Sequence, residues 1–220
     1  MSNSVPTLML LCLLGCILLA APLRLCYAET HRYLHRQGEQ RTILEWHLSE
    51  QEDHLRIVSI REAVRYVNVC LPSGQTLEWK MKAPHANIRA VRQGRVLLIS
   101  GTRQGNNYDS QKTIGDLPWL QPLSFSLRPL IAGSRNSLRF WMIHPKNLSV
   151  HKLYAESAAQ EILAVNGREY TSVRVDVSLN PLTVSFSKGS YWFRASDGLF
   201  LQFQGRTGIF GEQVHIELAD

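Results

Sequence analysis

Cysteine is scarce in this chain, and its distribution excludes most of the chemistry that cysteine could provide. Of four cysteines, Cys12, Cys16 and Cys26 lie near the amino terminus, so Cys70 is the only one in the rest of the chain. One thiol cannot form an intramolecular disulfide. Because Cys70 lies in a strand-like segment at residues 66–71, we predict a buried, unreactive core thiol rather than a nucleophile or an intermolecular bridge.

Signatures of catalysis and of cofactor binding are also missing. The sequence has no Gly-x-Ser-x-Gly elbow, no His-Glu-x-x-His helix and no glycine-rich phosphate loop. Asp197, in Ser-Asp-Gly, is typical of a hairpin turn and is not assigned as a catalytic acid. We therefore assign no catalytic residue and no cofactor, and an enzyme is the least favoured interpretation.

Metal and nucleic-acid sites find little support. His31 and His35 would share a face if the segment were helical, but no carboxylate or cysteine lies at a spacing that completes a ligand set, so residues 31–35 are interpreted as part of an exposed tail and no metal site is assigned. The net charge of +6 is dispersed, without the basic run that nucleic-acid binding needs. A solvated basic surface, or attraction to an anionic membrane, accounts for it.

No apolar run is long enough to span a bilayer, which needs about 20 apolar residues. The run at residues 8–21 is followed by Cys26-Tyr27-Ala28, with small residues where a signal peptidase reads. We expect a signal peptide at residues 1–28, cleaved after Ala28. An uncleaved anchor and lipidation at Cys16 are the alternatives. The mature chain, residues 29–220, is then one periplasmic domain with no stable transmembrane span.

Alternation with a period of two dominates the mature chain and predicts half-buried strands. At residues 171–179 the apolar residues Val173, Val175 and Val177 alternate with polar ones. Short strands joined by turns predict an antiparallel meander. The expected strands are 42–48, 55–60, 66–71, 76–81, 86–92, 95–100, 138–143, 171–179, 182–186, 199–204 and 213–218, with turns at 72–74 and 93–94 and a loop at 101–111.

Two segments, 95–99 and 138–143, are apolar on both faces and predict central strands covered on each side. The expected cover is residues 117–133, where leucines recur at helical spacing, Asp116 could cap, and Pro122 and Pro129 limit the helix to one or two short pieces. The predicted fold is mainly β with minor α: a curved antiparallel meander sheet or half-open barrel with one or two short helices packed against it. Such a fold has either a closed core or an apolar pocket. The predicted pocket lining is Trp119, Leu123, Leu127, Phe140 and Trp141.

Four stretches resemble the exported bacterial family called domain of unknown function 3108. They are Pro-Trp-Leu-Gln-Pro at 118–122, Phe-Trp-Met-Ile-His-Pro at 140–145, Gly-Arg-Glu-Tyr-Thr at 167–171 and Tyr-Trp-Phe-Arg-Ala-Ser-Asp-Gly at 191–198. The resemblance covers roughly residues 74–218. It implies a periplasmic protein similar in architecture to the lipoprotein carriers, with a curved antiparallel sheet wrapped over helices.

Two functions follow as hypotheses. The first is non-catalytic binding of an apolar ligand, such as lipid or an acylated lipoprotein chain, between sheet and helix. The second is a structural or protein-interaction module of the cell envelope, with a closed core, that binds envelope proteins through an exposed strand edge or basic face.

Overall fold

The computed structural model describes residues 28–133, 135–179, 189–206 and 212–219. The predicted signal peptide, apart from Ala28, and the predicted strand at 182–186 lie outside them. The described residues form one antiparallel sheet whose strand order is β8-β7-β6-β5-β4-β3-β2-β1-β14-β13-β12-β11-β10-β9. Strands β8 and β9 are the two ends of this order and do not pair, so the sheet is not closed into a barrel. This agrees with the curved meander sheet predicted from the alternation.

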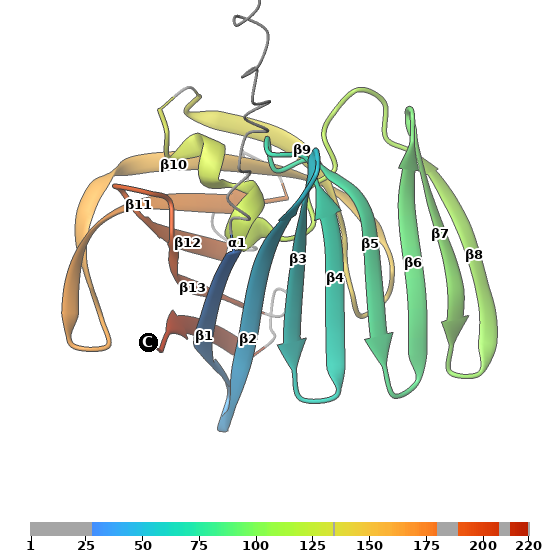
Figure 1. Cartoon of the computed structure of the whole chain (residues 1–220), viewed down its shortest axis with the longest axis horizontal. Coiled ribbons are helices and arrows are strands. Elements are labelled where there is room, and N and C mark those ends of the chain that lie inside the picture. Colours follow the sequence, from blue (N-terminus) through green and yellow to red (C-terminus); the bar gives the residue numbers. More distant parts are fainter. Residues whose placement is uncertain (1–27, 134, 180–188, 207–211, 220) are drawn as a thin grey trace, which may run out of the picture.

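The sheet consists of two meanders that join where β1 pairs with β14, for example Tyr33 with Leu218. In Figure 1 the strands of the first meander stand upright, while β10–β13 cross them at a steep angle. The first meander contains β1 (Ala28–Gln37), β2 (Gln40–Gln51), β3 (His54–Arg61), β4 (Val64–Cys70), β5 (Thr76–Ala83), β6 (Ala86–Gln93), β7 (Val96–Arg103) and β8 (Asn106–Thr113). The second contains β9 (Ser137–Ile143), β10 (Val150–Val165), β11 (Arg168–Ser178), β12 (Gly189–Arg194), β13 (Phe200–Arg206) and β14 (Gln213–Leu218).

Two segments expected to be irregular are strands, so those predictions were wrong. Residues 31–35 are not a tail but the middle of β1, which pairs with β2 along its whole length and holds the two meanders together. Residues 101–111 are not a loop: β7 continues through Arg103, and β8 follows after a two-residue turn. Strand β8 was not predicted because its side chains are polar. An edge strand whose side chains are mostly exposed needs no alternation of apolar and polar residues.

The helical cover is shorter than expected. Residues 117–133 contain only α1 (Leu123–Ser126) and the 3₁₀ helix η1 (Arg128–Leu130), which lie between the two meanders (Figure 1). Asp116 is no cap; its side chain is exposed and pairs with Arg95. Pro122 precedes α1 and Pro129 lies in η1, so each proline limits the run of helical hydrogen bonds.

The predicted turn at 72–74 positions α1 on the sheet. Gly74 has a φ of +85°, and a Cβ atom on it would lie 2.8 Å from the Cα of Ser126. Only glycine permits both this conformation and this approach. The Ser126 hydroxyl donates a 2.6 Å hydrogen bond to the Gly74 carbonyl, which fixes α1 against the β4–β5 turn.

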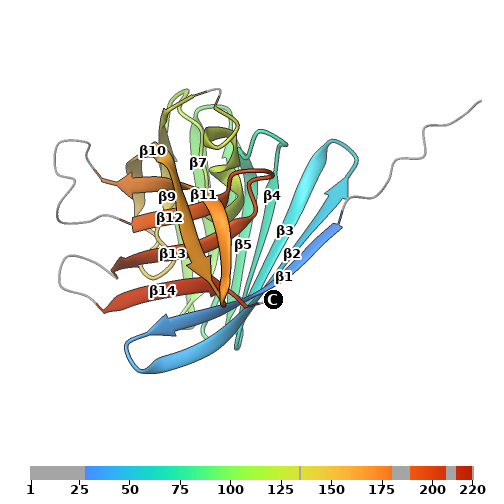
Figure 2. The ribbon, with the colours of Figure 1, turned by 90° about the vertical axis from the view of Figure 1, so that its left-hand side faces the viewer.

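Strand β9 has a buried residue on each face, as predicted, but the prediction of a central strand was wrong, because β9 is last in the hydrogen-bonding order. Phe140 belongs to a large cluster that contains residues of α1, η1, β1–β4 and β10–β14. Ile143, on the opposite face, belongs to a second cluster with the inner faces of β5–β7. The sheet is therefore rolled, and Figure 2 shows β9–β14 in front of β5 and β7. The prediction of burial on both faces was wrong for residues 95–99, because Val96 and Leu98 are only half-buried.

Residues 118–121 run beside β9 and join it to β5. Trp141 donates a backbone hydrogen bond to the Pro118 carbonyl and accepts one from the Leu120 amide, each 2.9 Å long. The Thr76 amide donates to the Trp119 carbonyl at 2.8 Å. This segment thus covers part of the free edge of β9 and links the two meanders.

Candidate functional site

The five residues predicted to line a pocket are held in two different clusters. Leu123, Leu127 and Phe140 lie in the large cluster around α1, whereas Trp119 lies in the second cluster with Trp141 packed against it. Four of the five are buried, and Trp141 is half-buried. The structure therefore brings together the first three and places the two tryptophans on the other side of β9.

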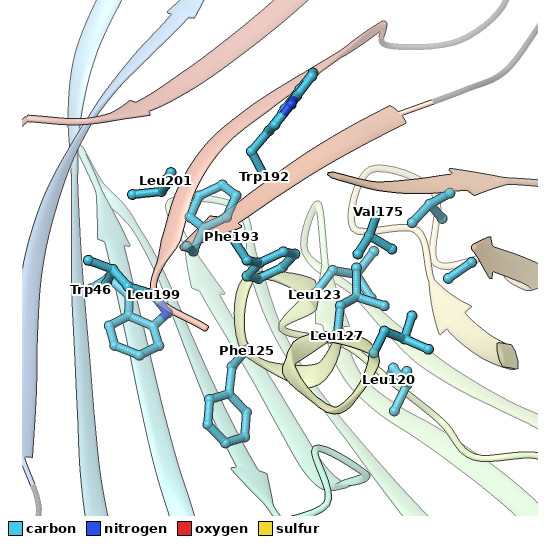
Figure 3. Packing of buried hydrophobic residues seen from close by; sticks show 14 of the residues in the cluster. Trp46, Leu120, Leu123, Phe125, Leu127, Val175, Trp192, Phe193, Leu199 and Leu201 are labelled. Carbon is cyan, nitrogen blue, oxygen red and sulfur yellow. The ribbon is translucent and has the colours of Figure 1, made fainter. Parts of the chain in front are cut away.

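The end of the roll that contains α1 and η1, here called the helix end, is tightly packed. Figure 3 shows Leu123 and Leu127 of the helical segment beside Val175, with Phe193 between them and Trp46, and all of these residues belong to the large cluster. An ion pair closes this end: Arg128 donates from both terminal nitrogens to the Glu29 carboxylate at 2.9 Å each. The guanidinium also lies 5.0 Å from the Phe125 ring centroid and 5.7 Å from that of Trp46.

At the opposite end of the roll, here called the far end, the inner face is less covered. On β2, β4 and β14 the inward-facing residues change from buried near α1 to half-buried away from it, whereas on β1 the order is reversed, since His31 is half-buried and His35 is buried. On β2, Trp46 and Leu48 are buried but Leu44 is half-buried. The half-buried apolar residues on this part of the inner face, here called the far-end set, are Leu44, Val64, Tyr66, Tyr191, Phe203 and Ile216.

Cross-strand pairing joins the three members of the far-end set on β12–β14, while Val64 and Tyr66 pack against the second cluster. Phe203 lies opposite both Tyr191 and Ile216, and its ring centroid is 4.7 Å from that of Tyr191. Two glycines make room for this ring, because a Cβ on Gly189 or Gly205 would lie 2.8 or 2.5 Å from it. Burial raises the pKa of Tyr191, so its hydroxyl stays neutral.

A polar group adjoins the far-end set. His35 is 7% exposed, and its Nε2 lies 2.5 Å from Nη1 of Arg61. Since a guanidinium only donates, Nε2 carries the lone pair and the imidazole is neutral. Burial, and then the charge of Arg61, lower the pKa of His35 to about 4. Burial raises the pKa of the neighbouring Tyr66, and the Arg61 charge opposes that shift.

Sequence reasoning missed both the far-end set and this polar pair. His31 and His35 were considered together, but they have separate surroundings: His31 lies 3.4 Å from Glu29 at the helix end, whereas His35 contacts Arg61. Alternation along the strand could have revealed the position of His35. Residues 31, 33 and 35 fit a strand with Tyr33 facing inward, and that pattern places His35 on the inner face.

Other polar candidates have structural roles. Asp197 is a turn residue, as predicted: it accepts from the Leu199 amide at 3.1 Å and pairs with Arg194. Cys70 is buried, as predicted, and burial raises the pKa of its thiol to about 12. Within the described ranges, no three His, Cys, Asp or Glu side chains are grouped as a metal site would require. Nor does any helix in this part of the chain have the length and apolar character to cross a membrane.

Comparison with known proteins shows likeness of fold. A crystal structure described as a beta-barrel-like protein of domain of unknown function DUF1849 from Brucella abortus has a TM-score of 0.56 at 7% identity, covering 90% of this chain and 98% of that one. The hypothetical lipoprotein YmcC from Escherichia coli (K12) has a TM-score of 0.36 at 11% identity, covering 88% and 84%, which is too low to support an argument. No family model and no curated protein matches the sequence, so membership of family 3108 stays a prediction.

Proposed function

We propose that this protein binds an apolar ligand, a lipid or an acylated chain, on the inner face of the rolled sheet at the far end. One observation carries the proposal: six apolar side chains of the far-end set remain half-buried although they face inward. Covering apolar surface contributes about 25 cal/mol per Å². An alkyl chain laid along this surface would therefore bind without any catalytic group.

In this proposal the five predicted residues support the site from its inner end. Leu123, Leu127 and Phe140 form the floor that stops the chain from reaching the helix end. Trp119 and Trp141 pack on the face of β9 opposite Phe140 and stabilise the strand there. The Trp141 indole donates a hydrogen bond to the Ile114 carbonyl at 2.7 Å. A rigid floor lowers the entropy cost of ligand binding, because fewer side chains must be ordered.

We also propose an envelope location, with cleavage after Ala28 and relatedness to family 3108. The ion pair of Glu29 with Arg128 agrees with the cleavage, because it places the first residue of the predicted mature chain within the fold. Residues 191–198, on which the family resemblance chiefly rests, form most of β12 and the turn before β13. Amino-terminal sequencing of exported protein should begin at Glu29.

The test uses protein exported from the full-length gene and purified without detergent. Native mass spectrometry should show a co-purifying lipid, and a fluorescent fatty acid should bind saturably. Leu44 and Ile43 provide a matched pair, because they are adjacent on β2 but face opposite sides of the sheet. Leu44→Gln should weaken fatty-acid binding about tenfold while Ile43→Gln leaves it unchanged. Equal effects, or no binding by the wild type, would refute the proposal.

A second function, protein interaction, is supported by β8. Within the described part of the chain β8 pairs only with β7, so its other edge can accept a strand from another protein. Its amides should then become protected in hydrogen exchange when an envelope protein binds. Exchange that is unchanged by every envelope fraction would exclude this function.

A further inference from the structure

A cationic side chain faces the interior beside the far-end set. Arg61 pairs across strands with Leu44, whose inward direction follows from its alternation with Trp46 and Leu48. Opposite residues of neighbouring strands share a face, so Arg61 also points inward. It is half-buried, in contrast to Arg65, which is exposed on the outer face of the next strand.

Arg61 has an unusual set of partners for an inward-facing arginine. Within the described residues no carboxylate oxygen lies within 4.0 Å of its guanidinium, and its hydrogen-bond partner is the neutral ring of His35. The part-buried Arg128, by comparison, has a bidentate carboxylate partner. A positive charge removed from water costs free energy unless an anion compensates it.

An orphaned hydroxyl lies in the same place. Thr42 is the cross-strand partner of His35, so both side chains are on the inner face. The Thr42 Oγ1 is buried and has no hydrogen-bond partner within the described residues. A buried donor without a partner costs about 1–3 kcal/mol, which a ligand oxygen would recover.

We propose that Arg61 and Thr42 bind the anionic head group, a carboxylate or a phosphate monoester, of a single-chain amphiphile whose tail covers the far-end set. The inference rests on the proposed function and specifies its ligand. The forked guanidinium donates to two oxygens of the anion, and the Thr42 hydroxyl donates to one of them. His35 is a positioning residue, because its Nε2 holds one edge of the guanidinium and directs the remaining donors.

The order of residues along the strands agrees with this orientation. Arg61 is the last residue of β3. Ser59 and Ile57, on the same face of the strand, lie progressively nearer the helix end. Leu44 lies directly opposite Arg61, and Tyr66 lies within reach of its charge. A head group on Arg61 thus starts the tail beside Leu44 and Tyr66, and the chain proceeds inward.

The experiment compares three ligands that share one alkyl chain: dodecanoate, dodecyl phosphate and dodecan-1-ol. Binding is measured by displacement of a fluorescent fatty acid from exported wild-type protein. One or both anions should bind at least about tenfold more tightly than the alcohol, the scale of a charged hydrogen bond. A preference for one anion identifies the head group, and inorganic phosphate alone should not compete.

Three variants locate the effect. Arg61→Gln should lose the preference for the anion and retain the affinity for the alcohol, while Arg65→Gln keeps both. Leu44→Glu places a carboxylate opposite Arg61 and should exclude anions more strongly than Leu44→Gln does. Thermal unfolding of each variant checks that the fold persists, and Arg61→Lys, which keeps the charge, should retain part of the preference.

The outcomes separate the two proposals. Equal binding of acid and alcohol, unchanged in Arg61→Gln, would overturn the head-group inference and leave apolar binding in place. No saturable binding of any of the three ligands would overturn both. Loss of anion preference in Arg65→Gln as well as Arg61→Gln would show general surface attraction, which also contradicts a site on the inner face.

Discussion

The side-chain amide of Gln121 pairs with the backbone of Ile143 as a neighbouring strand would. Its Nε2 donates to the Ile143 carbonyl at 2.8 Å, and its Oε1 accepts from the Ile143 amide at 3.0 Å. The same Oε1 accepts from the Trp119 indole at 3.1 Å. One side chain therefore satisfies three polar groups where β9 meets the segment that links it to β5.

Replacing Gln121 should destabilise the protein strongly. Gln121→Ala leaves the Ile143 amide and carbonyl and the Trp119 indole without their partner, and unmade buried hydrogen bonds cost about 1–3 kcal/mol each. We expect a loss of at least about 2 kcal/mol in urea unfolding at pH 7. Gln111→Ala, on the exposed surface of β8, should change stability by less than about 0.5 kcal/mol. Similar values for the two variants would show that Gln121 does not hold this junction.

Stability should depend on pH through His35. Its folded pKa, about 4, lies below the ordinary value of 6.5, so the unfolded chain binds the extra proton between these values. The free energy of unfolding should thus be fully supported above about pH 6.5 and fall as the pH drops towards 4, by at most about 3 kcal/mol.

His35→Gln keeps an acceptor for Arg61 but removes the titration. Its unfolding free energy should change less between pH 6.5 and 4 than that of the wild type. The comparison is made as a difference because burial also lowers the pKa values of His144 and His215, which contribute with the same sign in both proteins. Parallel pH profiles would contradict the buried, neutral state of His35.

The Cys70 thiol should not react with thiol reagents in the folded protein. Burial raises its pKa to about 12, with the Thr76 hydroxyl contact opposing the shift, so the thiolate is scarce at neutral pH and the sulfur is covered. Ellman's reagent should detect no thiol in the native processed chain and one in denaturant. Rapid labelling of the native protein would show that the segment around β4 opens.

The ion pair at the helix end should require arginine. Arg128→Lys keeps the charge but cannot donate with a fork to Glu29, and it loses the flat contact with Phe125 and Trp46. We expect a loss of about 1–2 kcal/mol in unfolding free energy. Arg139→Lys, at an exposed position of β9, serves as the control and should be neutral. Equal stability of the two variants would mean that Arg128 contributes only its charge.

Alternation predicted most of the sheet because one face of each strand is buried. Val173, Val175 and Val177 are all buried on β11, and strands β2–β6 lie close to their predicted ranges. The pattern failed where burial does not follow it. Tyr108 and Ser110 are the half-buried positions of β8, and its remaining side chains are exposed. An edge strand of this composition is indistinguishable from a polar loop in sequence.

The candidate site was less predictable than the fold because it depends on how the sheet rolls. Leu127 and Trp119 are both apolar residues of one segment, yet β9 separates their clusters. Arg61 follows an apolar strand, and only its register opposite Leu44 shows that it faces inward. No local sequence pattern shows at which end of the sheet the inward-facing side chains stay partly exposed, because this depends on where α1 packs.

Methyl NMR during titration with dodecanoate tests the central claim most directly. The account predicts saturable shifts at the methyl groups of Leu44, Val64 and Ile216 on the inner face, with Ile43 on the outer face of β2 unchanged. Shifts confined to exposed methyls such as Ile43 and Ile162, or none at all, would contradict ligand binding at the far end.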